Sequence, residues 1–299
     1  MQVELPADKT EALHADALKF LRGRQTIPRR AMRRFAGQAS FVAGLVPWLR
    51  PFLSGVWAAL QEPIVHLGPV GPGEMRSGAQ YVLWKEQVLL SLTWLEAFLA
   101  GTAGAPLRRE AYLVDRQFDG RFTVAVDASP WGLGGVLLDS GRAVAAFADK
   151  VSPEDRERLQ VVVGDHRSQS LLEGLAILVA LRIFLRWRCG EVAKVSVRSD
   201  SKAALGMALN LASPSPLMNA VGREIAYDTA LGDYRVELCE HTPGVANVSP
   251  DFLSRQFSPE GDAKEVPPAL QGVPLLEVPQ RTQGFWRTWL APEAPRVSR

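Results

Sequence analysis

The sequence predicts an α/β protein in which a mixed five-stranded sheet with flanking helices follows a mainly helical region. Two observations support this prediction. Residues 119–257 alternate strand-forming runs with amphipathic helical stretches. Residues 1–116 instead hold long segments with helical spacing of apolar residues, interrupted by proline and glycine. We therefore expect a helical region at 1–116, an α/β domain at 117–257 and a proline-rich tail at 258–299.

Two stretches of the first region have clear helical periodicity. Residues 29–60 form one apolar-rich segment, in which Pro47 and Pro51 are expected to bend or end a helix. Residues 80–99 place apolar side chains on one helical face, and Gly101 follows as the expected stop. Further breaks are expected at Pro28, at Pro63 and in the Gly-Pro-Val-Gly-Pro-Gly run at 68–73.

Six arginines and no acidic residue gather between positions 21 and 34. They are Arg22, Arg24, Arg29, Arg30, Arg33 and Arg34. One interpretation is a face that binds phosphate groups. The other is an ordinary solvated helix face, and clustering alone does not decide between them.

The α/β domain begins with three predicted strands. Residues 122–127 alternate β-forming side chains and end on Asp127, and a glycine-rich turn at 131–135 leads into the strand 136–138. A second turn leads into the strand 143–148. These runs predict a three-strand meander.

The elements that follow alternate between helix and strand. Residues 168–187 have the apolar spacing of a strong amphipathic helix. The later predicted elements are a strand at 195–199, helices at 201–211 and 216–231, a strand at 235–240 and a last helix from 250–255. The predicted order is therefore β-β-β-α-β-α-α-β-α.

The composition excludes several classes of protein. With 47% hydrophobic and 22% charged residues, the 299-residue chain can bury a core and is not disordered throughout. Lys+Arg 34 against Asp+Glu 32 gives a net charge of only +2, so bulk charge does not indicate a polyanionic partner. The two cysteines form no disulfide framework or metal cluster, and we expect an intracellular location in the cytoplasm or nucleus. Acidic residues near the start argue against a secretory signal, and no apolar run is long enough to predict a membrane span.

Four acidic residues occupy positions suited to chemistry. Asp127 and Asp200 follow the first and fourth predicted strands, and these two acids meet if the strands are parallel neighbours. Glu173 lies in the first long helix of the domain, and Asp251 opens the last helix. Four converging carboxylates repel one another unless cations neutralise them. Oxygen ligands without His or Cys favour Mg²⁺ or Mn²⁺ over zinc.

Each acid also has an ordinary structural interpretation. Asp127 stands at a turn, and Asp200 precedes a helix that it is suited to cap. Glu173 and Asp251 lie near helix N-termini, where acidic residues favour the helix dipole. The combination of the four, more than any one of them, indicates a functional site.

Four motifs in this order resemble the ribonuclease H domain of retroelement reverse transcriptases. The motifs are Thr-Val-Ala-Val-Asp127-Ala-Ser-Pro-Trp-Gly-Leu-Gly-Gly135, Leu-Leu-Glu173-Gly-Leu-Ala176, Val-Arg-Ser-Asp200-Ser201 and His241-Thr-Pro-Gly-Val-Ala-Asn247-Val-Ser-Pro-Asp251-Phe-Leu-Ser-Arg255. The resemblance covers about 119–257 and is strongest for long-terminal-repeat and tyrosine-recombinase retrotransposons. Residues 33–52 resemble, less specifically, the thumb and connection segment that follows the polymerase palm in these proteins.

The resemblance implies a ribonuclease H-like fold and a metal-dependent endoribonuclease that cleaves the RNA strand of RNA–DNA hybrids. It implies that Asp127 bridges two Mg²⁺ ions, with Mn²⁺ as a possible substitute. Glu173 and Asp200 would then hold one ion and Asp251 the other. Contacts with 2′-hydroxyl groups would select the hybrid. Ser201 and Asn247 are candidate contacts to the nucleic acid or to the metal loop. The other candidate contacts with nucleic acid are Arg29, Arg30, Arg33 and Arg34.

Three departures from the family pattern affect the prediction. His241 lies ten residues before Asp251, where cellular-type enzymes carry a mobile histidine, but its His-x-Pro-Gly setting favours a structural role. The segment 212–216 is too short to form the basic protrusion with which some members of the family bind the hybrid. Other basic residues are therefore expected to bind it. These are Arg182, Arg186, Arg188, Lys194 and Arg198, or the N-terminal arginines. No Tyr-x-Asp-Asp motif occurs, so we expect a C-terminal piece of a reverse transcriptase with a separate polymerase part as partner, or a degenerate copy.

Two alternatives to the nuclease remain open. The same fold without activity would serve as a nucleic-acid-binding or assembly module, which the departures above favour. A hydrolase of another kind with paired carboxylates, such as a glycosidase, would act without a metal ion. Cleavage of a hybrid separates the nuclease from the first alternative, and the effect of a chelator separates it from the second.

Overall fold

The computed structural model describes residues 2–62, 82–110, 121–187, 193–259 and 265–292. The chain divides into two compact units, one of Met1–Val114 with Thr288–Arg299 and the other of Asp115–Arg287. The break predicted at 68–73 and the boundary predicted at 116 lie outside the described residues. No helix within the described ranges has the length and apolar character needed to cross a membrane.

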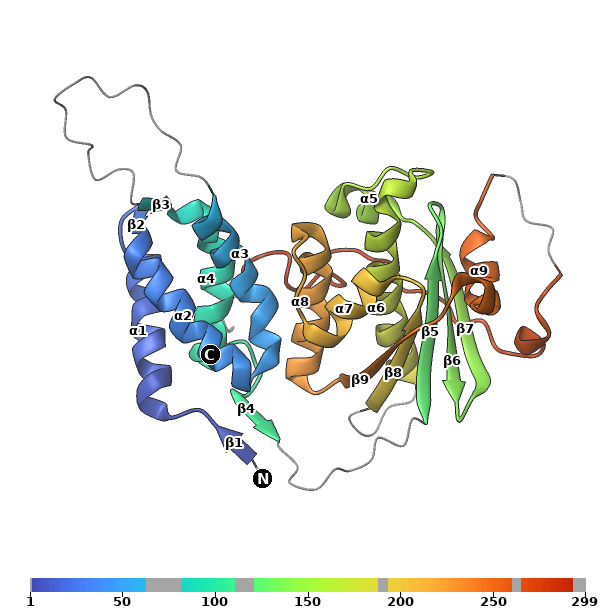
Figure 1. The fold of residues 1–299 in the computed structure, drawn as a ribbon, viewed down its shortest axis with the longest axis horizontal. Coiled ribbons are helices and arrows are strands. Elements are labelled where there is room, and N and C mark those ends of the chain that lie inside the picture. Colours follow the sequence, from blue (N-terminus) through green and yellow to red (C-terminus); the bar gives the residue numbers. More distant parts are fainter. Residues whose placement is uncertain (1, 63–81, 111–120, 188–192, 260–264, 293–299) are drawn as a thin grey trace, which may run out of the picture. The chain divides into compact units, whose positions relative to one another are not determined.

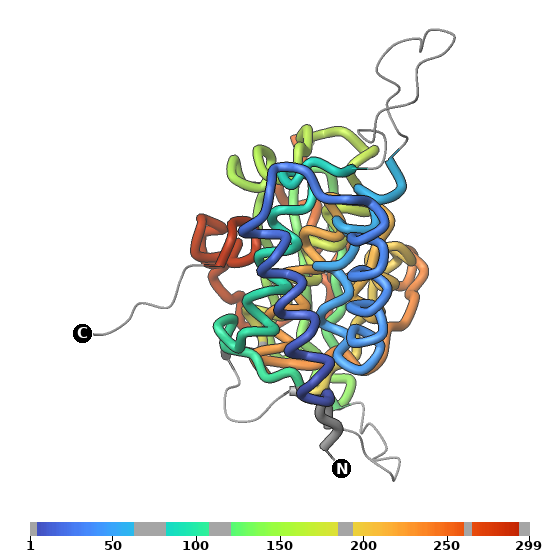
Figure 2. The backbone as a smooth tube through the Cα atoms, turned by 90° about the vertical axis from the view of Figure 1, so that its left-hand side faces the viewer, coloured from blue at the N-terminus to red at the C-terminus, as the bar shows by residue number. Residues whose placement is uncertain are grey.

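Helices dominate the first unit, as predicted. They are α1 (Ala7–Arg22), α2 (Arg29–Leu45), α3 (Arg50–Gln61) and α4 (Lys85–Leu99), and they lie side by side in Figure 2. Two short antiparallel pairs join them: β1 (Gln2–Glu4) with β4 (Arg108–Glu110), and β2 (Thr26–Pro28) with β3 (Val82–Trp84). The core is partly aromatic, since the ring of Phe52 lies 5.1 Å from that of Phe98 and 5.5 Å from that of Trp94.

Prolines and a glycine set the helix limits of this unit. Pro47 begins a single 3-10 turn between α2 and α3, and Pro51 occupies the first turn of α3, where its missing N–H costs no hydrogen bond. Gly101, with φ of 74°, follows α4 as expected. The helix predicted from residue 80 begins only at Lys85, because Val82–Trp84 pair with β2 instead. Leu89, which the apolar spacing places on the buried face, is instead exposed.

The second unit is built on one mixed sheet. Its strands are β5 (Phe122–Ala128), β6 (Gly132–Asp139), β7 (Arg142–Lys150), β8 (Ala193–Ser199) and β9 (Tyr234–His241). Their order in the sheet is β7-β6-β5-β8-β9 (Figure 1). The first three strands form the predicted antiparallel meander, whereas β8 runs parallel to β5 and β9 runs parallel to β8. This arrangement confirms the predicted ribonuclease H-like fold class. It also meets the condition that the first and fourth strands are parallel neighbours.

Helices cover both faces of this sheet. They are α5 (Pro153–Leu159), α6 (Gln169–Trp187), α7 (Lys202–Asn210), α8 (Pro216–Leu231) and α9 (Val248–Arg255). Figure 1 shows α6, α7 and α8 on one side of the strands and α9 on the other. The sequence did not predict α5. This helix is short and mostly polar, and the capping box that starts it, between Ser152 and Asp155, is a local signal without apolar periodicity.

The proline-rich segment packs on the second unit over much of its described length. Leu276 N donates to the carbonyl of Ala146 in β7 at 2.7 Å, which covers part of this edge strand. Further along, the Arg281 guanidinium is buried between the carboxylates of Asp149 and Asp155. Trp286 is also fully buried. Residues 274–286 are therefore part of the folded unit.

Candidate metal centre

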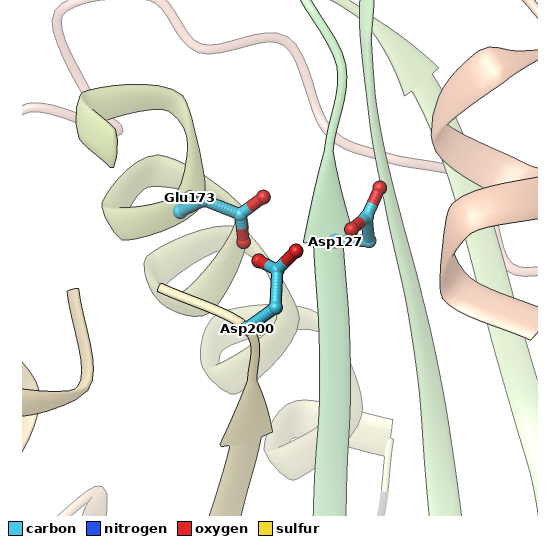
Figure 3. A group of neighbouring side chains, drawn as sticks. All are labelled: Asp127, Glu173 and Asp200. Atoms are coloured by element: carbon cyan, nitrogen blue, oxygen red, sulfur yellow. The ribbon is translucent and has the colours of Figure 1, made fainter. Parts of the chain in front are cut away.

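Asp127 and Asp200 meet at the carboxyl ends of two parallel strands. Ala125 of β5 pairs with Arg198 of β8, and each acid lies two residues further along its chain. Glu173 reaches the same place from α6 (Figure 3). One carboxylate oxygen from each of these three acids lies within 4.8 Å of the other two. The structure therefore brings together three of the four predicted acids.

Glu173 is held in place by donors from both strands. Its Oε1 accepts a hydrogen bond from Ala128 N at 2.8 Å, and its Oε2 accepts one from the Ser199 hydroxyl at 2.9 Å. The side chain is only 1% exposed, so it does not act as a solvated first-turn acid. Both oxygens are thus oriented by the sheet. Gln169, one turn earlier on α6, also donates to Oε1 at 3.4 Å.

Asp200 is exposed beside the buried pair and is not a helix cap. The cap of α7 is Ser201, whose hydroxyl accepts from Ala204 N at 3.3 Å. The cap interpretation of Asp200 is therefore wrong, and its carboxylate is available for another role. Ser201 itself, a predicted contact with nucleic acid, is half-buried and uses its hydroxyl in this cap. A Cβ added at Gly244 would lie 3.3 Å from Asp200 Oδ2, so the loop after β9 passes close to this carboxylate.

Asp251 lies outside the three-acid cluster. It is on α9, and its Oδ1 accepts from Arg255 Nε in an i,i+4 ion pair. Its charge still acts on Asp127, whose pKa it raises. The expectation that four carboxylates converge is thus met by three of them. The fourth, Asp251, lies nearby and is paired with a guanidinium.

Burial and mutual repulsion disfavour the charged form of the two interior acids. Burial, opposed by the Ser254 hydrogen bond and reinforced by the charges of Asp251 and Asp200, raises the pKa of Asp127 to about 7. Burial also raises the pKa of Glu173 well above its ordinary value, with Asp127 as the second cause. A bound cation would reverse both effects. The group has only carboxylate oxygens as donors, which fits Mg²⁺ or Mn²⁺.

Asn247, a candidate contact to the nucleic acid or the metal loop, is engaged within the chain, next to Asp127. Its side chain is only 3% exposed, and its Nδ2 donates to the carbonyl of Val126 at 2.8 Å. This bond holds the start of α9 against β5, one residue before Asp127. Asn247 is therefore part of the scaffold of the site.

His241 is exposed at the end of β9, where it pairs in register with Ser199. Within the described part of the chain, its ring forms no hydrogen bond or ion pair. The structural role predicted for this histidine thus has no contact to support it.

Of the four arginines predicted to contact nucleic acid, one is engaged with backbone carbonyls and three are exposed. Arg29 Nη2 donates to the carbonyls of Leu60 and Glu62 at the end of α3, which is a structural role. The remaining three are exposed on α2, and one of them, Arg34, lies 3.6 Å from Asp16. The three are Arg30, Arg33 and Arg34.

One suggested gripping residue is excluded by burial. Arg182 is 7% exposed and pairs with Asp228 at 2.7 Å and Glu224 at 2.8 Å, so it cannot reach a ligand at the surface. Arg198 pairs with Glu240 on the neighbouring strand. The side chain of Arg186 and the whole of Arg188 lie outside the described residues.

Two serines that serve the buried acids were not singled out from the sequence, although both lie in the quoted motifs. Ser199 donates to Glu173, and the Ser254 hydroxyl donates to Asp127 Oδ2 at 2.6 Å. Serine is common and has no characteristic spacing. The available signals were its position one residue before Asp200 and its place in the Leu-Ser-Arg end of the last motif.

No family model and no curated protein matches the chain. Among the solved structures that show a likeness are the following two. The crystal structure of RNase H1 from the halophilic archaeon Halobacterium salinarum is 19% identical, with 46% of this chain and 96% of that chain covered and a TM-score of 0.35. A foamy viral protease-reverse transcriptase, solved in complex with double-stranded DNA, is 13% identical, with 80% and 36% covered and a TM-score of 0.25. At these values the likenesses add nothing to the fold class, which is defined by the strand order.

Proposed function

We propose that the protein is a metal-dependent endoribonuclease that cleaves the RNA strand of RNA–DNA hybrids and corresponds to the C-terminal part of a retroelement reverse transcriptase. The observation that carries this proposal is the three-acid cluster of Asp127, Glu173 and Asp200 at the carboxyl edge of two parallel strands. The four-motif resemblance supplies the substrate class and the suggestion of a polymerase partner. The exposed arginines of α2 are proposed to contact phosphates of the nucleic acid.

The residues of the site have distinct tasks in this proposal. Asp127, Glu173 and Asp200 would hold Mg²⁺, and Asp251 would join them for a second ion. When bound, the ions lower the pKa of the attacking water and stabilise the leaving 3′ oxygen. Ser199 and the backbone of Ala128 keep Glu173 oriented, so that it needs no rearrangement to act as a ligand.

A labelled RNA–DNA hybrid tests the proposal. The wild type is expected to cut the RNA strand in Mg²⁺, to stop when a chelator is added, and to leave a DNA duplex intact. Asp127→Asn removes a ligand and should abolish cleavage. Asp139→Asn is the matched control, because Asp139 lies at the far end of β6, half-buried and paired with Arg121. A folded wild type that leaves the hybrid uncut, or an Asp127→Asn variant that still cuts, contradicts the proposal.

One observation favours a second candidate, an inactive nucleic-acid-binding module of the same fold. Asp251 is engaged by Arg255 and lies outside the three-acid cluster, so the fourth ligand is not in place. Salt-sensitive binding of the hybrid without Mg²⁺-dependent cleavage would establish this candidate.

A further inference from the structure

The Leu-Ser-Arg end of the last motif has no role in the function proposed above, yet Ser254 contacts one of the three acids. Ser254 is fully buried. Its hydroxyl lies 2.6 Å from Asp127 Oδ2 and 3.1 Å from the carbonyl of Asp251. A hydroxyl has one hydrogen to donate, and the shorter contact, to a carboxylate, is the stronger of the two.

Glycines in β6 make this contact possible. A Cβ added at Gly134 would lie 2.5 Å from the carbonyl oxygen of Pro250 and 2.6 Å from the nitrogen of Ser254. A Cβ added at Gly132 would lie 2.6 Å from the carbonyl oxygen of Ser254. Helix α9 therefore rests directly on the backbone of β6, at a separation that any larger residue would prevent.

A second contact fixes the same residue from the other side. The carbonyl oxygen of Ser254 accepts from the Ser129 hydroxyl at 2.7 Å, and Ser129 Oγ accepts from the nitrogens of Trp131 and Gly132. Ser254 is thus tied to the turn that follows Asp127 as well as to Asp127 itself. Its hydroxyl is held at a fixed place relative to the carboxylate.

We propose that Ser254 is a positioning residue for the metal site, because its hydroxyl fixes the rotation of the Asp127 carboxylate and so sets the direction in which this ligand meets the cation. Within the described residues, Oδ1 of Asp127 accepts no hydrogen bond, so all of its lone pairs remain open to a metal ion. The same hydroxyl links Asp127 to the helix that carries Asp251. This inference rests on the proposed metal site, but it does not depend on which substrate the site acts on.

Ser254→Ala and Ser254→Thr test the proposal, with Mn²⁺ alone as the probe of the metal site. Titration of Mn²⁺ followed by electron paramagnetic resonance needs no substrate. Loss of a group that orients a metal ligand typically weakens metal affinity roughly 10- to 100-fold. We expect this loss in Ser254→Ala and recovery of most of it in Ser254→Thr, which restores a hydroxyl. Cleavage of the hybrid by Ser254→Ala should show a lower kcat with little change in KM.

Thr229→Ala is the matched control. The Thr229 hydroxyl donates to the carbonyl of Ile225 within α8, away from the acids, so its removal deletes a helix back-bond only. Metal affinity should be unchanged in this variant. If the wild type binds Mn²⁺ and Ser254→Ala binds it equally tightly, the positioning role of Ser254 is overturned, but the metal site itself is supported. If the wild type binds no Mn²⁺, both are overturned, and if it binds Mn²⁺ without cutting the hybrid, only the proposed function falls.

Discussion

Replacing Asp127 by Asn should stabilise the metal-free protein at alkaline pH, although it removes a metal ligand. The folded state raises the pKa of Asp127 from 3.8 to about 7, so it binds this proton more tightly than the unfolded chain does. The contribution of the protonated Asp127 side chain to the free energy of unfolding is fully present below pH 3.8 and is lost as the pH rises toward 7. The neutral amide of Asn cannot be deprotonated and avoids this loss.

The size of the effect follows from the two pKa values. Linkage gives a gain for Asp127→Asn of about 4 kcal/mol at pH 8 and about 2 kcal/mol at pH 5, and no gain in strong acid. For a domain of this size, the change between pH 5 and pH 8 corresponds to roughly 5–10 °C in Tm. The raised pKa of Glu173 has the same sign, so the wild type should itself lose stability over this range.

Thermal unfolding of both proteins in chelator, at several pH values, measures this difference. Asp139→Asn serves again as the control, because it removes a half-buried carboxylate of the same unit at the far end of β6. Added Mn²⁺ should raise the Tm of the wild type at pH 8 and leave that of Asp127→Asn nearly unchanged. An Asp127→Asn protein that is less stable than the wild type at pH 8, or a gap that does not widen with pH, would refute the reasoning.

Three further predictions concern residues around the site and in the proline-rich segment. Arg255→Gln frees Asp251 and should lower the Mg²⁺ concentration for half-maximal cleavage. Because the ion pair is half-exposed, the free energy of unfolding should change by less than about 0.5 kcal/mol. An unchanged Mg²⁺ requirement would contradict the prediction that Asp251 is a ligand held back by Arg255. Asn247→Ala leaves the Val126 carbonyl without its donor and should lower the free energy of unfolding by about 1–3 kcal/mol. Loss of hybrid binding without loss of stability would contradict this. Arg281→Ala leaves the buried Asp155 without its guanidinium and should cost about 3–5 kcal/mol in urea unfolding, unlike a change at an exposed arginine.

The sheet and its acids were predictable because they depend on local patterns. Strands β5 and β8 are runs rich in β-forming residues. Asp127 lies near the end of the first, Asp200 directly follows the second, and parallel pairing then brings both acids to one edge. Glu173 was predictable only through its motif, since its placement depends on how α6 packs across the sheet. The helix limits near Pro47 and Gly101 follow from the backbone chemistry of these two residue types.

The failures come from contacts between distant parts of the chain. Nothing in the local sequence shows that Asn247 bonds to Val126, or that the amphipathic face of α6 buries Arg182 among acids of α8. The choice of cap at α7 was also open, because Asp200 and Ser201 are both good caps and only the backbone path selects Ser201. In each case the polar side chain was recognised from the sequence, but the group that it contacts was not.

The central claim is that Asp127, Glu173 and Asp200 together hold a divalent cation. The most direct measurement is the anomalous scattering of Mn²⁺ in crystals of the protein grown or soaked with that ion. The account predicts a strong peak among these three carboxylates, with ligand oxygens from each of them, and its absence in crystals of Asp127→Asn. A wild-type crystal that shows no peak there at saturating Mn²⁺, or only peaks bound by other acids, would contradict the account.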